Sequence, residues 1–340
     1  MTITNEFGPL FDQLSAPPLN TPVQPHLSSV SKDYPLALTP GIDPIVLDSW
    51  QTQDGADVRS HRLLHLDLPG QRHRLLHTGT EGGRDSDLVI ANLPGWTETL
   101  SGFVLRKTHA RLSHELPDAI IDTHATYGTD GTLSHANPLV ITKQSLENAA
   151  QKTFNAFLPL YDDKRLVLVA TSMGAAILAR MEEINQSEGS PLDIVGRILY
   201  EPCLVLPEHA GVRMFSRLAI HLTINTLDEI VHQSSPRAAL SFIEDGVHSL
   251  PPFTDLPVIW RLGWSLLGWT RPELLNSLAE RHPTVIQGKH DVLREPAFEG
   301  HPDVVIKLLQ GKGHCMSNNS TKRALAIAKA VRAMGLHQPR

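Results

Sequence analysis

Three residues of this 340-residue chain have the chemistry of a nucleophilic site. Ser172, Asp291 and His314 each come shortly after an apolar run that predicts a β-strand, so all three are expected at one edge of a sheet. A serine hydroxyl is a weak nucleophile unless a neighbouring imidazole takes its proton. We expect Ser172 to attack, His314 to act as general base and then protonate the leaving group, and Asp291 to hold the imidazole in the correct tautomer.

The serine lies within residues 165–179, which read RLVLVATSMGAAILA. The apolar residues before it do not alternate with polar ones, which indicates a strand covered on both faces, and the small residues after it indicate a closely packed helix. A nucleophile on such a sharp turn has strained backbone geometry, so the residues two before and two after must be small. Ala170 and Gly174 meet this requirement. The amide of Met173, at the start of the helix, is expected to point where negative charge develops during acyl transfer.

This segment resembles the Gly-x-Ser-x-Gly elbow of the serine-nucleophile α/β-hydrolase superfamily, with Ala170 in place of the first glycine. The order Ser172, Asp291, His314 is also the order of that superfamily. The resemblance covers residues 60–335 and implies an α/β-hydrolase fold, which is a mostly parallel, doubly wound sheet flanked by helices with a helical cap insertion. For the pentapeptide alone, the alternative is an ordinary strand-to-helix turn with a capping serine.

A second loop follows the strand predicted at residues 87–92 and reads Leu-Pro-Gly-Trp. In the superfamily the loop at this place supplies the second amide of the oxyanion hole. The resemblance therefore implies that the backbone N–H of Trp96 joins that of Met173 in stabilising the oxyanion. The alternative is a plain turn after a strand.

Two other residues compete for roles in the site. Glu201, at the end of another predicted strand, is an alternative acid, but Gly288 provides the turn that favours Asp291. His290 is a rival base, although its position next to Asp291 makes it hard for its ring to reach both the acid and the serine.

The alternation of predicted strands and helices divides the chain into three parts. Residues 1–45 are rich in proline and predict an extended arm. Residues 46–203 and 281–340 predict the α/β core. Residues 204–280 predict the helical cap, because the strand pattern lapses there and helical patterns replace it.

The cap contains a helical segment in which Trp260 and Trp264 fall on one face. We interpret this face as the apolar wall of a substrate pocket. The alternative is packing of the cap against the core, and tryptophan is expected to be buried in either case.

Histidines cluster between residues 61 and 77, on both sides of a Pro-Gly break. The pairs His61/His65 and His73/His77 have a four-residue spacing that can hold a metal on a helix. The Pro-Gly break and the partial alternation instead favour an exposed β-hairpin, so we expect no metal site here.

Composition narrows the class of protein. The chain is 41% hydrophobic and 19% charged, which is typical of globular proteins, and its formal net charge of −6 argues against nucleic-acid binding. No run approaches the roughly 20 apolar residues of a membrane span, and the first residues lack the pattern of a secretion signal. We therefore expect a soluble cytoplasmic protein. Its two cysteines, Cys203 and Cys315, exclude a disulfide framework and a thiolate metal cluster, and no cofactor is expected.

The sequence thus predicts a metal-independent serine hydrolase that acts on a small molecule, namely a carboxylic ester or a related thioester, lactone or amide. An acyltransferase would need the same triad, so it stays an alternative. A ligand-binding protein that keeps the fold without the chemistry is the third possibility. The sequence leaves the substrate and the oligomeric state open.

Overall fold

A computed structural model describes residues 42–80, 86–130, 132, 145–203, 223, 227, 230–231, 235–267, 272–288, 298, 301, 304–309 and 319–336. Its strands are β1 (Ile45–Asp54), β2 (Asp57–Leu68), β3 (Gln71–Thr78), β4 (Leu88–Leu93), β5 (Ile120–His124), β6 (Arg165–Thr171), β7 (Asp193–Tyr200), β8 (Thr284–Gly288) and β9 (Val305–Leu309). Its helices are α2 (Phe103–Glu115), α4 (Leu146–Leu160), α5 (Gly174–Ser187), α7 (Pro236–Val247), α8 (Leu256–Leu267), α9 (Pro272–Ala279) and α10 (Ser320–Ala333).

The described strands form one nine-stranded sheet in the order β1-β2-β3-β5-β4-β6-β7-β8-β9. In this spatial order, all neighbours from β5 and β4 to β9 pair in parallel. The strands β1, β2, β3 and β5 pair antiparallel in succession. The expected parallel sheet is confirmed for this larger part. The strand β1 was not expected, because its one apolar run, residues 45–47, is short and directly follows the proline-rich segment.

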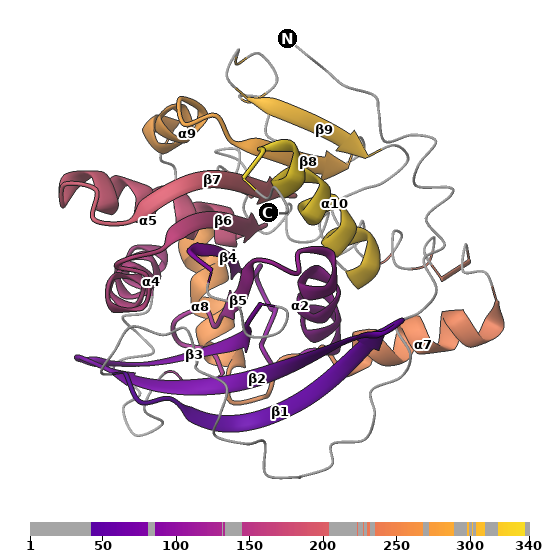
Figure 1. Ribbon diagram of the computed structural model, residues 1–340. Coiled ribbons are helices and arrows are strands. Elements are labelled where there is room, and N and C mark those ends of the chain that lie inside the picture. The colour runs from indigo at the N-terminus through magenta and orange to yellow at the C-terminus, as the bar shows by residue number, and fades with distance from the viewer. Residues whose placement is uncertain are drawn as a thin grey trace.

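Helices cover both faces of the sheet (Figure 1). On β6, Leu166 and Leu168 pack in the cluster that contains residues of α4, α5, α8 and α9. Val167 and Val169, which point to the opposite face, pack with residues of α2 and α10. This two-sided burial explains why the strand before Ser172 lacks polar alternation.

The β2–β3 hairpin forms as expected, but the expectation that it is exposed is wrong. His61, His73 and His77 are all buried, because α2 packs on one face of the hairpin and α4 on the other. Their ring nitrogens find polar partners that lie far away in sequence, which allows the imidazoles to be buried. Among the described residues, no group of three or more His, Cys, Asp or Glu side chains could hold a metal ion.

Two hydrogen-bonded networks contain these histidines. The α2 network, on the side of the sheet that α2 covers, consists of Asp57, His114, Thr52, His61, Thr78, His109 and Thr123 in order of contact. The α4 network, on the opposite side, consists of His77, Asp122, Tyr161, His124 and His73. Each successive pair of polar atoms lies 2.7 to 2.9 Å apart.

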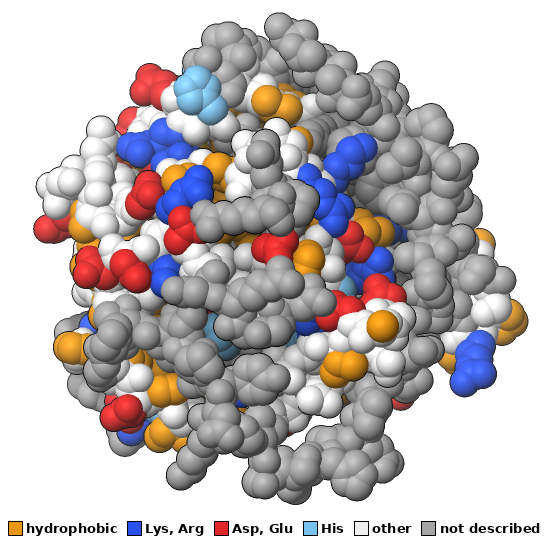
Figure 2. Space-filling model, viewed as in Figure 1, with side chains coloured by type: hydrophobic (Ala, Val, Ile, Leu, Met, Phe, Trp, Pro, Cys, Tyr) orange, Lys and Arg blue, Asp and Glu red, His pale blue; other side chains and the backbone are white. Residues whose placement is uncertain are grey.

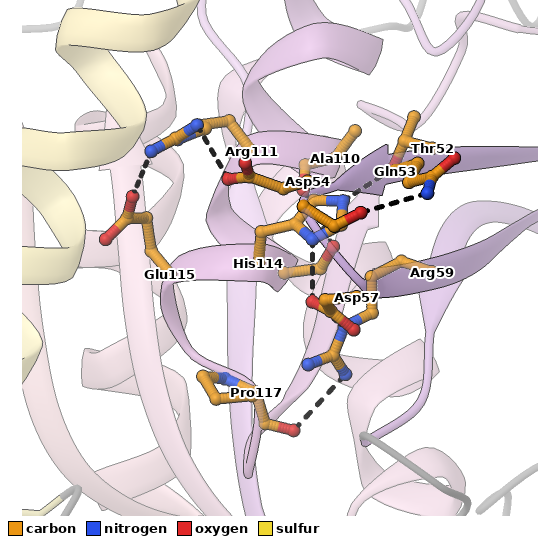
Figure 3. Close-up of polar contacts among 12 residues, drawn as sticks. Thr52, Gln53, Asp54, Asp57, Arg59, Ala110, Arg111, His114, Glu115 and Pro117 are labelled. Atoms are coloured by element: carbon orange, nitrogen blue, oxygen red, sulfur yellow. Dashed lines mark hydrogen bonds and ion pairs between the residues drawn. The ribbon is translucent and has the colours of Figure 1, made fainter. Parts of the chain in front are cut away.

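The C-terminal end of α2 docks on the β1–β2 hairpin through the first members of the α2 network (Figure 3). His114 lies between the two strands, with Nδ1 2.7 Å from Asp57 Oδ2 and Nε2 2.9 Å from Thr52 Oγ1. Arg111, one turn earlier, binds Asp54 and Glu115. Polar contacts therefore fix the helix that follows the Trp96 loop.

The described residues between β7 and β8 include the helices α7, α8 and α9. Polar contacts attach α7 and its following turn to α2: Lys107 binds Asp245, and Ser249 Oγ accepts a hydrogen bond from the Val104 amide. Ser265 on α8 likewise accepts one from the Leu146 amide. No described helix is long and apolar enough to cross a membrane.

Both ends of the last helix, α10, are capped. Asn319 caps α10 by accepting a hydrogen bond from the Lys322 amide. Gly335 ends the helix with a φ of 67°. On the described part of the molecular surface seen in Figure 2, acidic and basic side chains are intermixed.

Candidate active site

Ser172 occupies a strained turn between β6 and α5. Its φ of 48° lies in the left-handed region, which non-glycine residues rarely adopt. The Ser172 amide donates to the Tyr200 carbonyl at 3.0 Å, and the Ser172 carbonyl accepts from the Cys203 amide at 3.1 Å. These bonds attach the turn to the end of β7 and hold the strained residue in place, as strained positions require.

Gly174 allows α5 to approach the loop that follows β4. A Cβ added at Gly174 would lie 2.5 Å from the Leu93 carbonyl oxygen and 2.8 Å from that of Pro94. Both atoms belong to the backbone, so no side-chain movement could relieve the clash. The requirement for a small residue two positions after the serine therefore has a direct steric cause.

Met173 lies between the serine and the first residue of α5, with helical φ and ψ of −56° and −30°. Its N–H has no hydrogen-bond acceptor among the described residues. An N–H at a helix N-terminus carries part of the positive end of the helix dipole. The Met173 amide is therefore chemically suited to bind an oxyanion.

The Trp96 loop lies against the serine. A Cβ added at Gly95 would be 3.3 Å from Ser172 Cβ, which places this backbone directly beside the candidate nucleophile. The indole Nε1 of Trp96 donates to the Ile259 carbonyl on α8 at 2.7 Å. Gly263 on α8 makes room for the indole, because a Cβ there would lie 2.8 Å from Trp96 Cζ2. The helical insertion thus contacts the loop itself.

Two residues that the sequence did not reveal connect this loop to the turn at Ser172. The carboxylate of Glu98 accepts a hydrogen bond from the Gly95 amide and forms an ion pair with Arg323 of α10. Arg323 also donates to the hydroxyl of Thr171, the residue before the serine, at 2.7 Å. Glu98 and Arg323 are 225 positions apart, and no local pattern links them.

The alternative acid, Glu201, is buried at the end of β7 with a φ of 48°. Its amide donates to the Ile286 carbonyl on β8 at 2.7 Å. Glu201 therefore has strained backbone at the end of the strand that pairs with β6. Cys203, two residues later, is buried and is not disulfide-bonded.

Several predicted residues lie outside the described part of the chain. Asp291, His314 and the rival base His290 are among them, so the assembly of the triad stays a prediction. Cys315 and the predicted arm up to residue 41 also lie outside it.

The two predicted pocket tryptophans lie on α8. The expectation that Trp260 is buried is wrong, because its side chain lies on the solvent face of α8 and is 68% exposed. The neighbouring Ile259 and Leu262 are the buried residues of that turn. The side chain of Trp264 lies outside the described part of the structure.

The buried Asp130 joins the loop after β5 to the Trp96 loop and to the helical insertion. Asp130 Oδ2 accepts from the Leu100 amide at 3.0 Å, and the Asp130 amide donates to Asp255 just before α8 at 2.7 Å. Burial, with a further contribution from the nearby Asp255 charge, raises the pKa of Asp130 to about 6.

Comparison with solved structures identifies the architecture. The chain is similar to an α/β hydrolase from Novosphingobium aromaticivorans, at a TM-score of 0.55 and 13% identity over 81% of this chain and 98% of that one. The chain has the α/β-hydrolase fold. A serine hydrolase involved in carbazole degradation, named CarC, gives a TM-score of 0.56 at 12% identity over 81% and 98% of the two chains. An esterase from Thermogutta terrifontis gives 0.51 at 14% identity over 87% and 99%.

Neither protein-family models nor curated protein sequences match the chain. The structural likeness therefore establishes the α/β-hydrolase fold predicted from the elbow. The chemistry depends on the residues at the site.

Proposed function

We propose that this protein is a serine hydrolase that cleaves a carboxylic ester, or a related thioester, lactone or amide, through an acyl-enzyme on Ser172. The observation that carries the proposal is the backbone at Ser172: a φ of 48° between a buried strand and a helix whose Gly174 is pressed against the next loop. Strained residues of this kind cluster at functional sites. The α/β-hydrolase fold supports the same conclusion by analogy.

In the proposed reaction His314 takes the proton of the Ser172 hydroxyl as the oxygen attacks the substrate carbonyl. The amides of Met173 and Trp96 stabilise the tetrahedral oxyanion, and removal of one such donor typically costs about 3 to 4 kcal/mol of barrier. The intermediate collapses, and the leaving alcohol, thiol or amine takes the proton from His314. Water then attacks the acyl-enzyme by the same route and releases the acid. Asp291 orients the imidazole throughout.

The division into an arm (residues 1–45), a core (46–203 and 281–340) and a cap (204–280) belongs to this proposal. The contact between Trp96 and Ile259 supports a cap that lies against the oxyanion loop. Trp264 and the exposed Trp260 remain the candidate wall residues of the substrate pocket.

The proposal is tested by hydrolysis of p-nitrophenyl esters, from acetate to long acyl chains, and by labelling with a fluorophosphonate read by mass spectrometry. Wild type and Ser172→Ala are compared, with circular dichroism to confirm that both are folded. Turnover and a label on Ser172, both lost in the variant, are expected. The absence of any label on the folded wild type would refute Ser172 as the nucleophile, and labelling without hydrolysis would point to acyl transfer.

A further inference from the structure

The oxyanion loop contains a strained turn. The Glu98 amide donates to the Gly95 carbonyl at 3.3 Å, which closes a four-residue turn around Trp96 and Thr97. Thr97 has a φ of 72°, although it is β-branched and exposed. Turns of this shape normally place glycine or asparagine at this position, and a β-branched residue there is a genuine outlier. Further contacts must therefore hold the turn in this conformation.

The side chain of Glu98 holds the turn from within. Its Oε2 accepts a hydrogen bond from the Gly95 amide at 2.5 Å, so the carboxylate binds the first residue of the turn that it ends. The same carboxylate forms a two-atom ion pair with the guanidinium of Arg323. A hydrogen bond from an amide to an ionised carboxylate is stronger than one to a neutral group.

Arg323 connects that carboxylate to the nucleophile turn. Its side chain is 2% exposed, its Nη2 donates to Thr171 Oγ1 at 2.7 Å, and its guanidinium lies 5.7 Å from the centre of the Tyr200 ring. Thr171 precedes Ser172, and Tyr200 accepts the Ser172 amide hydrogen bond. Burying a guanidinium is unfavourable unless its partners are well placed. This one is placed so that it binds both halves of the candidate site.

We propose that Glu98 and Arg323 are positioning residues that fix the Trp96 amide relative to Ser172. The inference rests on the proposed function, because it assigns them a role in the same acyl-transfer site. Neither side chain needs to touch the substrate. Their effect is to hold the Gly95–Glu98 turn in a conformation that its own sequence disfavours, so that the oxyanion donor is in place before the reaction.

The main test is Glu98→Gln, measured on the p-nitrophenyl ester that the wild type cleaves best. A misplaced donor weakens binding of the transition state more than that of the substrate, so kcat should fall about 10- to 100-fold while KM stays within about twofold. The matched control is Glu115→Gln. Glu115 is also largely buried and also pairs with an arginine of α10, Arg332, at 3.0 Å. That control should keep the wild-type kcat even if it lowers the melting temperature.

A second variant separates positioning from general stability. Thr97→Gly removes the steric cause of the strain, so a turn with glycine needs less support from Glu98. The double variant Thr97→Gly/Glu98→Gln should therefore recover most of the kcat that Glu98→Gln loses alone. Arg323→Lys keeps the positive charge but lacks the planar guanidinium, and should lower kcat without changing KM. Circular dichroism and thermal unfolding confirm that each variant is folded.

The outcomes distinguish this inference from the proposed function. If the wild type shows no Ser172-dependent turnover, both are overturned. If turnover is present but folded Glu98→Gln keeps the wild-type kcat, or loses no more than Glu115→Gln, the positioning role alone is overturned. A loss of kcat that Thr97→Gly leaves unchanged would also overturn it, because the effect would then not arise from the strained turn.

Discussion

Lowering the pH from about 7.5 to about 5 should destabilise the folded protein by at least about 3 kcal/mol, mainly through its buried histidines. Burial lowers the pKa of His61 from 6.5 to about 3 and that of His73 from 6.5 to about 4. The unfolded chain therefore binds a proton at each of these positions as the pH falls below 6.5, whereas the folded protein does not. The stability that the neutral rings contribute is present above this range and is lost as the pH falls.

The magnitude follows from the lowered pKa values of His61 and His73 and from one opposing group, Asp130. At about pH 5, each of these histidines lowers the free energy of unfolding by about 2 kcal/mol. Asp130 acts in the opposite direction, because its folded-state pKa of about 6 means that the folded protein gains a proton first. Its protonation raises the free energy of unfolding by about 1 kcal/mol at the same pH. Burial also holds the pKa of His109 and His124 well below 6.5, so these two rings add to the loss.

The assay is urea unfolding followed by tryptophan fluorescence at both pH values, in the wild type and in His73→Gln. The variant should show a smaller difference between the two pH values by about 2 kcal/mol, because glutamine does not titrate. Its stability at neutral pH should fall, since the 2.8 Å contact with His124 changes. His248→Gln is the control, because that ring lies on the surface. An equal pH dependence in wild type and His73→Gln would refute the reasoning.

Three further substitutions test the packing around the site. Gly174→Ala places a Cβ 2.5 Å from the Leu93 carbonyl oxygen, so it should lower stability by about 1 to 3 kcal/mol in urea unfolding and abolish ester hydrolysis. Trp96→Phe removes the indole hydrogen bond to α8 and should cost about 1 kcal/mol, with a measurable change in KM. Tyr161→Phe removes a donor to buried Asp122 and should cost about 1 to 3 kcal/mol by the same unfolding measurement, leaving kcat unchanged.

The parts of the fold that could be predicted are those encoded by local steric and apolar patterns. The run before Ser172 must be buried on both faces because it has no polar alternation, and it forms β6. The need for a small residue at position 174 follows from the shape of the turn, and the structure shows the backbone atoms that impose it. Such features depend on a few neighbouring residues, so the sequence displays them directly.

The buried hairpin could not be predicted because its polar partners are distant. His73 hydrogen bonds with His124, which is 51 positions away, and His77 with Asp122, which is 45 positions away. A histidine whose partners are unknown is read as polar and therefore as exposed. Only the strand order, which brings β5 beside β3, shows that these rings can be buried with their hydrogen bonds satisfied.

The candidate site depends on the whole fold in the same way. The loop that carries Trp96 begins at β4 and is attached at three further points by segments that lie far apart in the chain. Arg323 of α10 holds Glu98, Ile259 of α8 holds the Trp96 indole, and Asp130 binds the amide of Leu100. A serine elbow alone specifies where the nucleophile lies. In the proposed function these three attachments place the oxyanion donor beside the serine, so the elbow sequence alone does not establish the activity.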